Sequence, residues 1–261
     1  MHRIFAHHEE IAGDRVIITG QRAHHMSRVL RMSCGDVFVV VAPGGRQWTA
    51  QLEEIDSEVL TGRLLHERPR STEPSLHVTL AMAILKGDKM DWVIQKATEL
   101  GVHRLVPVMC QRSVTRIPPN KVSARTKRWQ RIALQAAGQS QRCAVPIVSS
   151  PRPLGSVLEE VSPVSIMAYE GESQKGLPQV LTDPSPSQVT LLIGPEGGFA
   201  PEEVEEARCR GVGTVGLGPR ILRAETAALA LLSMVMFRWG DLGHAAAASL
   251  ECPDMPDEHP E

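Results

Sequence analysis

The stretch from residue 191 to residue 204 reads LLIGPEGGFAPEEV, which predicts a strand that enters a helix through a glycine-rich turn. Pro201 suits the first turn of a helix, and the two glutamates after it favour the positive end of the helix dipole. Gly194, Gly197 and Gly198 let the backbone approach a ligand at the carboxyl end of the strand, where open α/β sheets bind their ligands. The alternative is a tight turn with no ligand. A Walker loop is excluded, because no Gly-Lys-Ser or Gly-Lys-Thr follows.

A second stretch, residues 215–229, reads VGLGPRILRAETAAL and again predicts a strand, a loop and a helix. This helix is apolar nearly all round from Ala227 to Trp239, so it requires burial inside the domain or against a second subunit. Arg223 and Glu225 stand between apolar segments, which favours a functional role over a solvated loop tip. Residues 211–216 match the letters of a dinucleotide fingerprint. We exclude that motif, because it follows a helix and itself contains a strand.

The same alternation of strand and helix extends back to residue 77. Asp88 can cap a helix that stops at Gly101, and another helix is expected around Trp129. Buried strands are expected at His77–Leu85, Leu105–Met109, Ser165–Tyr169, Val189–Ile193 and Thr214–Gly216. The pattern predicts an α/β domain with a mostly parallel sheet covered on both faces.

The first 70 residues follow a different pattern, that of short strands separated by turns. Strands are expected at Arg15–Ile18, Val37–Val41, Gln47–Leu52 and Val59–Leu65, with one or two helical turns within His24–Met32. Such strands predict a small barrel. A polar segment with two prolines, Arg68–Pro74, reads as a linker, and the acidic, proline-containing tail reads as disordered. We therefore expect domains at 1–70 and 74–245, and a disordered tail at 246–261.

Composition excludes several classes of protein. A hydrophobic fraction of 42% is that of a globular protein, and no apolar run reaches the ~20 residues that span a bilayer. The start of the chain has no apolar signal region, so we expect a cytoplasmic protein. Five scattered cysteines fit neither a disulfide framework nor a zinc site, and His24-His25 has no further ligand at metal spacing. We expect no metal.

Basic charge is concentrated in one part of the chain. Between Arg112 and Arg142 there are eight basic residues and no acidic one, although the net charge of the chain is −2. A solvated helix face normally mixes both signs, so this basic run indicates a surface for a polyanion, most commonly nucleic acid.

The motifs taken together resemble the ribosomal small subunit RNA methyltransferase E family, whose members have a trefoil-knotted SPOUT domain. The resemblance extends to Gly243 and rests on the two stretches above and on residues 25–32 (HMSRVLRM), 95–102 (QKATELGV) and 129–133 (WQRIA). It implies a PUA-like N-terminal barrel that binds RNA, a homodimer, and methylation of N3 of a uridine in the decoding region of 16S ribosomal RNA. The substrate would be that RNA or the assembled small subunit.

The resemblance also assigns roles to residues. S-adenosyl-L-methionine would lie in three loops, with Gly197 and Gly198 leaving room for it, and Arg223 and Glu225 would be catalytic. The cofactor-binding residues would be Ala168, Tyr169, Glu170, Ile193, Gly194, Pro195, Glu196, Gly197, Gly198, Leu217, Gly218, Arg220, Ile221, Leu222 and Ala227. Independently of the resemblance, the basic run supplies Arg112, Arg116, Lys121 and Arg128 as the expected RNA-binding residues, and the barrel supplies Arg28 and Arg31. Because the loops and the basic run are distant in sequence, we expect cofactor affinity not to depend on the basic run.

One position departs from the family pattern. Gly138 stands where the resemblance leads us to expect an acid before Arg142. If that acid takes part in the chemistry or orients an arginine, this chain either uses another residue or is a slower variant. Two alternative functions stay open: a knotted methyltransferase acting on another RNA position, such as a ribose hydroxyl, and a non-catalytic ribosome-assembly factor that binds RNA through the basic run.

Overall fold

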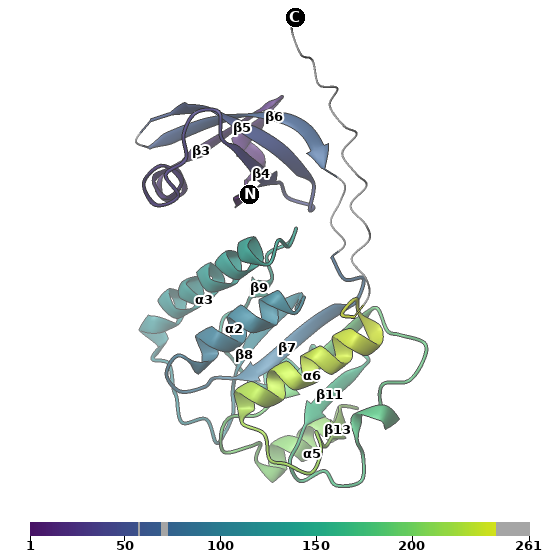
Figure 1. Ribbon diagram of the computed structural model, residues 1–261. Coiled ribbons are helices and arrows are strands. Elements are labelled where there is room, and N and C mark those ends of the chain that lie inside the picture. Colours follow the sequence, from purple (N-terminus) through teal and green to yellow (C-terminus); the bar gives the residue numbers. More distant parts are fainter. Residues whose placement is uncertain (57, 69–72, 244–261) are drawn as a thin grey trace, which may run out of the picture.

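The computed structural model describes residues 1–56, 58–68 and 73–243, and they form two sheets with separate cores (Figure 1). The first sheet is built before residue 69 and the second after residue 76. Part of the expected linker and the whole tail at 246–261 lie outside the described residues.

The N-terminal sheet has the strand order β1-β4-β5-β6-β3-β2. Its strands are β1 (Arg3–Phe5), β2 (Ile11–Ala12), β3 (Arg15–Thr19), β4 (Val37–Val41), β5 (Gln47–Ile55) and β6 (Val59–Arg68). All pairs are antiparallel except β1 with β4. In β3, buried Val16 and Ile18 alternate with exposed residues, as expected for a strand with one face on a core. The four expected strands are confirmed, and β1 and β2 are too short to show a periodicity.

Two short helical elements cross this domain between β3 and β4. They are α1 (Gln21–His24) and a single π-helical turn, η2 (His25–Val29), and they bury Ala23 and Met26 against the sheet. The expected one or two helical turns are therefore present, although they begin three residues earlier. A 3-10 turn, η1 (His8–Glu10), lies between β1 and β2.

The second sheet is parallel throughout and has the order β10-β8-β7-β12-β11-β13, with β9 also paired to β8. Its strands are β7 (His77–Ala83), β8 (Arg104–Met109), β9 (Ile147–Val148), β10 (Arg152–Pro153), β11 (Ser165–Ala168), β12 (Gln188–Ile193) and β13 (Gly213–Val215). Its helices are α2 (Lys89–Glu99), α3 (Pro119–Gln139), α4 (Leu154–Leu158), α5 (Pro201–Cys209) and α6 (Ala224–Trp239), and η3 (Leu177–Gln179) is a 3-10 turn. The predicted parallel sheet is confirmed.

Helices cover both faces of this sheet, as the continuous apolar strands require. Along β7, Leu80 and Met82 belong to the cluster that contains α2, α3 and α6 side chains, whereas Ala81 and Ala83 belong to the cluster that contains α4 and α5 side chains. This alternation follows from the two-residue period of a strand. The expectation of two covered faces is confirmed.

Two details of the helices differ from expectation. Helix α2 begins after Asp88, but the Asp88 side chain makes no capping hydrogen bond and is 98% exposed. Helix α6 is buried on one side through residues such as Leu231 and Val235, while Phe237 is 68% exposed and Met234 is 38% exposed. Burial inside the domain therefore accounts for one side of the apolar helix only.

Arg142 lies at the joint between the two domains rather than on a basic surface. Its side chain is buried, and its guanidinium donates to Glu73 Oε2 at 2.6 Å and to the carbonyl oxygens of Thr98 and Val102. Arg3 donates to the carbonyl of Arg142 and to Gln47 Oε1. Arg142 must therefore be removed from the basic run, because a buried and paired cation cannot meet a phosphate.

The same joint explains how the chain tolerates Gly138. A side chain there would point toward the carbonyl oxygen of Arg3, at the domain joint and not at the pocket described below. Glu73 orients Arg142 instead. Burial alone would raise the pKa of Glu73, but the hydrogen bonds and charge of Arg142 outweigh it and hold that pKa below its ordinary value.

Candidate active site

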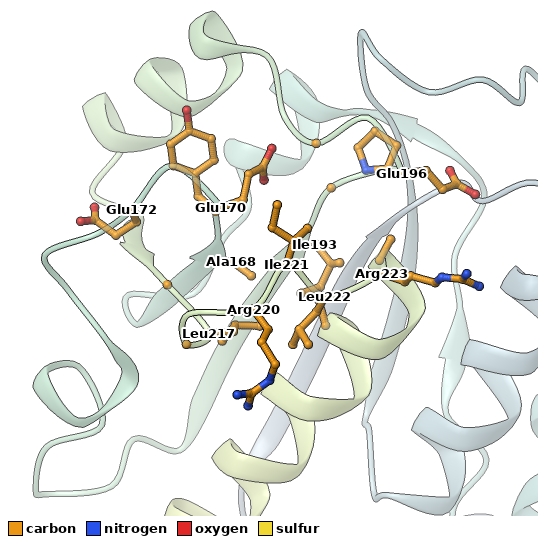
Figure 2. Close-up of a pocket in the computed structure, with 18 of the residues that line it drawn as sticks. Ala168, Glu170, Glu172, Ile193, Glu196, Leu217, Arg220, Ile221, Leu222 and Arg223 are labelled. Atoms are coloured by element: carbon orange, nitrogen blue, oxygen red, sulfur yellow. The ribbon is translucent and has the colours of Figure 1, made fainter.

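Three loops meet at the carboxyl edge of the parallel sheet, because β11 lies between β12 and β13 and all three strands run in one direction. Together they enclose a cavity of about 650 Å³ (Figure 2). The sheet therefore brings together sequence segments around residues 170, 195 and 220.

All fifteen residues expected to bind a cofactor line this cavity, as does Arg223. Their role as ligands stays a prediction, because the structure describes the protein alone. Sequence reasoning missed five lining residues, which are Lys89, Glu172, Gly216, Pro219 and Ala224. Gly216, Pro219 and Ala224 lie within residues 215–229. They would have been found if every residue of that stretch had been taken as a candidate. No motif pointed to Lys89, which reaches the cavity because the start of α2 adjoins it.

The glycine turn after β12 is shaped by its protein neighbours. Gly198 has a φ of 69°, and a Cβ added there would lie 2.1 Å from Oε1 of Glu170. A Cβ at Gly197 would instead meet the Cβ of Arg112 at 3.4 Å. A side chain at position 198 would therefore point at Glu170, and one at position 197 would point at Arg112. These neighbours are a second reason for glycine here, in addition to leaving room for a ligand.

Glu203 and Arg112 fasten this turn to the segment after β8. The buried Glu203 carboxylate accepts from the backbone N–H groups of Gln111 and Ala200, each at 2.8 Å. Arg112 donates to the carbonyl oxygens of Gly197 and Phe199 at 3.2 and 3.3 Å. The expectation that the basic run lies apart from the pocket is therefore wrong for Arg112, because the fold packs the two segments together.

Glu172 organises the loop after β11 and is not free for acid–base chemistry. It accepts from the Thr214 hydroxyl at 2.8 Å and from the N–H groups of Gln174 and Lys175. The Thr214 hydrogen bond is the main reason that the pKa of Glu172 is lowered. A Cβ at Gly216 would lie 2.5 Å from the Glu172 carbonyl oxygen. The close approach of this loop therefore requires glycine at position 216, directly after β13.

Charged groups gather at one end of the cavity, which we call the polar end: Lys89, Glu196 and Arg223 line the cavity there, and Glu225 pairs with Lys89 without lining it. In Figure 2, Glu196 and Arg223 lie at the opposite side of the pocket from Glu172. The Lys89 ammonium lies 3.3 Å from Oε1 of Glu225 and 3.7 Å from Oε1 of Glu196. Of the expected catalytic pair, Arg223 lines the cavity, whereas Glu225 does not line it and reaches this end through its ion pair with Lys89. The described part of the chain contains no hydrogen bond between the two.

The expected RNA-binding residues differ in their neighbours and in the domain that carries them. Arg116 and Lys121 are exposed and have no ion-pair partner among the described residues, whereas Arg128 pairs with Asp91. Arg28 and Arg31 are exposed on the N-terminal domain. Helix α3, which carries Lys121 and Arg128, contacts β1 of that domain (Figure 1). Of the six, only Arg112 touches a loop of the pocket.

Other classes of site gain no support from the described residues. Burial and the nearby Glu203 raise the pKa of the Cys110 thiol to about 12, so this cysteine stays protonated and is a poor nucleophile. No group of three or more histidine, cysteine, aspartate or glutamate side chains in the described ranges is arranged to hold a metal ion. None of the helices that the structure describes is long and apolar enough to cross a membrane.

Comparison with protein families matches two segments of the chain. The family described as "RNA methyltransferase domain" matches residues 72–236, and "RNA methyltransferase PUA domain" matches residues 18–65. The first segment contains the whole pocket lining.

Two relatives that match most of the chain carry the same name. Ribosomal RNA small subunit methyltransferase E of Bacillus subtilis is 33% identical over 228 residues, covering 85% of this chain and 89% of the relative. The protein of that name from Synechocystis is 34% identical over 238 residues, covering 90% and 77%.

Solved structures agree with these relatives. The methyltransferase E of Neisseria gonorrhoeae, bound to S-adenosyl methionine, superposes with a TM-score of 0.83 at 30% identity, over 93% of this chain and 99% of the other. A putative methyltransferase from Legionella pneumophila with bound cofactor SAM has a TM-score of 0.85 at 30% identity, over 92% and 98%.

Proposed function

The chain belongs to the ribosomal RNA small subunit methyltransferase E family, and on that premise we propose that it methylates N3 of one uridine in the decoding region of 16S ribosomal RNA, using S-adenosyl-L-methionine. The observation that carries the proposal is the cavity enclosed by the loops after β11, β12 and β13, since every expected cofactor residue lines it.

The cavity has the size and chemistry that this cofactor needs. Its volume of about 650 Å³ lies within the usual range for small-molecule sites. Apolar side chains of Ile193, Leu217 and Leu222 suit the adenine ring, and backbone groups of the glycine turn suit its polar edge. The Glu170 carboxylate, which packs against Gly198, can accept from ribose hydroxyls. When bound, S-adenosylmethionine supplies an electrophilic methyl group.

The polar end of the cavity supplies what the uridine needs. N3 is hidden in a base pair, so the target must be unpaired or extruded before it can react. N3 also carries a weakly acidic proton, so a base and a stabilising cation are required. We assign Glu225 as the base and Arg223 as a cation, because both lie at the start of α6, where Arg223 lines the pocket and Glu225 pairs with Lys89, which also lines it.

The remaining features fit an enzyme that acts on a large RNA. We assign the N-terminal domain a PUA-like role in holding RNA through Arg28 and Arg31, together with Arg116, Lys121 and Arg128 on the other domain. The pocket loops would form the trefoil knot of SPOUT enzymes. Assembled small subunits would be met in the cytoplasm.

The exposed side of α6 is the surface that we assign to homodimerisation. Met234, Phe237 and Leu242 form an apolar groove with Leu177 and Leu181, and α6 is apolar on its buried side as well. A second copy of the chain would cover this groove symmetrically. Sedimentation velocity of the purified chain would measure its oligomeric state. A monomer would show that this groove does not form a homodimer interface.

Nucleoside analysis by mass spectrometry tests the function in cells. Small-subunit RNA from a strain that lacks this chain should lack N3-methyluridine, and a plasmid copy should restore it. Loss of a ribose-methylated nucleoside would support the alternative RNA position, and an unchanged nucleoside set would support the assembly-factor alternative.

A further inference from the structure

Lys89 is the first residue of α2, and its ammonium reaches the polar end of the cavity. It lies between two carboxylates, at 3.3 Å from Glu225 and 3.7 Å from Glu196. The Glu196 carboxylate also accepts from the backbone N–H of Lys86. Lys89 therefore links the start of α2 with the glycine turn and with the start of α6.

Lys96 shows how an ordinary surface lysine of this helix behaves. It pairs with Glu99 at 2.8 Å within α2, three residues away, and its side chain is 36% exposed, against 37% for Lys89. The two lysines are thus equally exposed, but Lys96 does not line the cavity. Lys89 differs by joining three elements at the pocket.

Glu225 carries the observation that points to a ligand. Its Oε2 atom is fully buried, and among the described residues it is the one buried side-chain nitrogen or oxygen that has no hydrogen-bond partner. Leaving a buried acceptor unpaired is unfavourable, so native proteins seldom retain one without a functional reason. Lys89 pairs with the other oxygen, Oε1, so the ammonium links this buried carboxylate to the cavity that Lys89 lines.

The donors of Lys89 can be counted in the same way. An ammonium group has three N–H donors, and Glu196 and Glu225 can accept two of them. The third is left for the cavity that Lys89 lines. Uracil has a carbonyl on each side of N3, and both gain negative charge when the N3 proton leaves.

We propose that Lys89 is a catalytic residue that acts with Glu225. The Glu225 carboxylate takes the N3 proton, and Lys89, which lines the cavity, donates an N–H to the neighbouring carbonyl oxygen of the uracil anion. The N3 electron pair then forms the new bond to the methyl carbon, while the carbon–sulfur bond breaks and its electrons stay on sulfur. This inference rests on the proposed N3 chemistry and adds a residue to it.

The test compares single-turnover methylation by Lys89→Met, Lys89→Arg and the matched control Lys96→Met, with small subunits that lack the modification. Lys89→Met should lower the rate at least ~100-fold, the usual size of an electrostatic contribution to a transition state. Its S-adenosylmethionine affinity, measured by calorimetry, should stay within roughly threefold of wild type, because the cation acts on the uridine. Lys89→Arg should restore most of the rate, and Lys96→Met should match wild type.

A second readout separates catalysis from a merely structural bridge. Subunits containing 5-fluorouridine have a more acidic N3, so they need less help from a cation. Lys89→Met should therefore gain more from this substitution than wild type does. A wild-type rate in Lys89→Met would overturn the inference, as would a loss of rate that neither Lys89→Arg nor 5-fluorouridine relieves. If wild type makes a product other than N3-methyluridine, the proposed function fails and the inference fails with it.

Discussion

Gly198 combines a left-handed backbone with a close neighbour, which makes it a sharp probe of the pocket. A side chain there must adopt a φ of 69° and displace the Glu170 carboxylate. Gly198→Val should abolish S-adenosylmethionine binding in calorimetry while the protein stays folded, because the turn and Glu170 both shift. Gly13→Val is the matched control, since Gly13 has a φ of 62° and no atom within 4 Å of its Cβ position. If folded Gly198→Val kept the wild-type cofactor affinity, this pocket would not be the S-adenosylmethionine site.

Arg223 and Glu225 differ from the cofactor contacts in the step that they affect. Both belong to the polar end, and the account places them beside the uridine. Arg223→Ala and Glu225→Gln should each lower single-turnover methylation at least ~100-fold at saturating substrate, the usual size of acid–base or electrostatic help. Rapid-quench assays with labelled cofactor measure this rate. Near-normal rates would mean that other residues perform the proton transfer.

The contacts of some individual residues could not be predicted from the sequence. The glycines and Arg223 stand in two continuous stretches that the sequence displays directly. Lys89 stands in neither, because its place depends on the start of α2 adjoining the start of α6. Asp88 has the right residue type for a cap, but its side chain is left in solvent. Contacts between distant segments decided both positions, and a single sequence does not record them.

The residues of the basic run lie in three different environments. Arg112 belongs to the glycine turn, Arg142 to the domain joint, and Arg116 and Lys121 to solvent. The long strands and helices were predictable because their periodicity extends over many residues. Strands of two or three residues, such as β2, β9 and β10, were missed because so short a segment has no periodicity and depends on its partner strand.

This division predicts two separable effects. Arg112→Ala should weaken S-adenosylmethionine binding by roughly threefold to tenfold, about the value of one hydrogen bond, because the glycine turn loses its clamp. The Arg116→Ala/Lys121→Ala double variant should leave cofactor binding unchanged and weaken RNA binding. It should also reduce the slope of log affinity against log salt by roughly 0.7 to 0.9 per lost contact. Titrations of both ligands at several salt concentrations measure the two effects. If both variants changed cofactor affinity and RNA affinity in the same way, Arg112 would not have a role separate from that of Arg116 and Lys121.

At the scale of the whole molecule, a charged pair anchors the end of the linker to the second domain, next to the joint where Arg3 contacts Arg142. Arg142 is buried, and Glu73 is its carboxylate partner. Glu73→Gln should destabilise the protein by about 3 kcal/mol at pH 7, because it leaves a buried cation without its partner. Urea unfolding of both proteins measures the difference.

The pH dependence of this effect has a defined sign. The pKa of Glu73 is lowered in the folded protein, so its contribution is fully present above the pKa of an unfolded glutamate, about 4.3. The contribution is lost as the pH falls through the lower, folded value. The stability difference between wild type and Glu73→Gln should therefore shrink in acid. A difference that stays constant down to pH 2 would show that the ionised Glu73 does not stabilise the folded chain through Arg142.

The central claim joins the pocket to one chemical product, and a reconstituted reaction tests it most directly. Purified chain, S-adenosylmethionine and small subunits that lack the modification are incubated, and the RNA is digested for mass spectrometry. The account predicts close to one N3-methyluridine per subunit with wild type and none with Gly198→Val. A ribose-methylated nucleoside, or equal product from wild type and Gly198→Val, would contradict it.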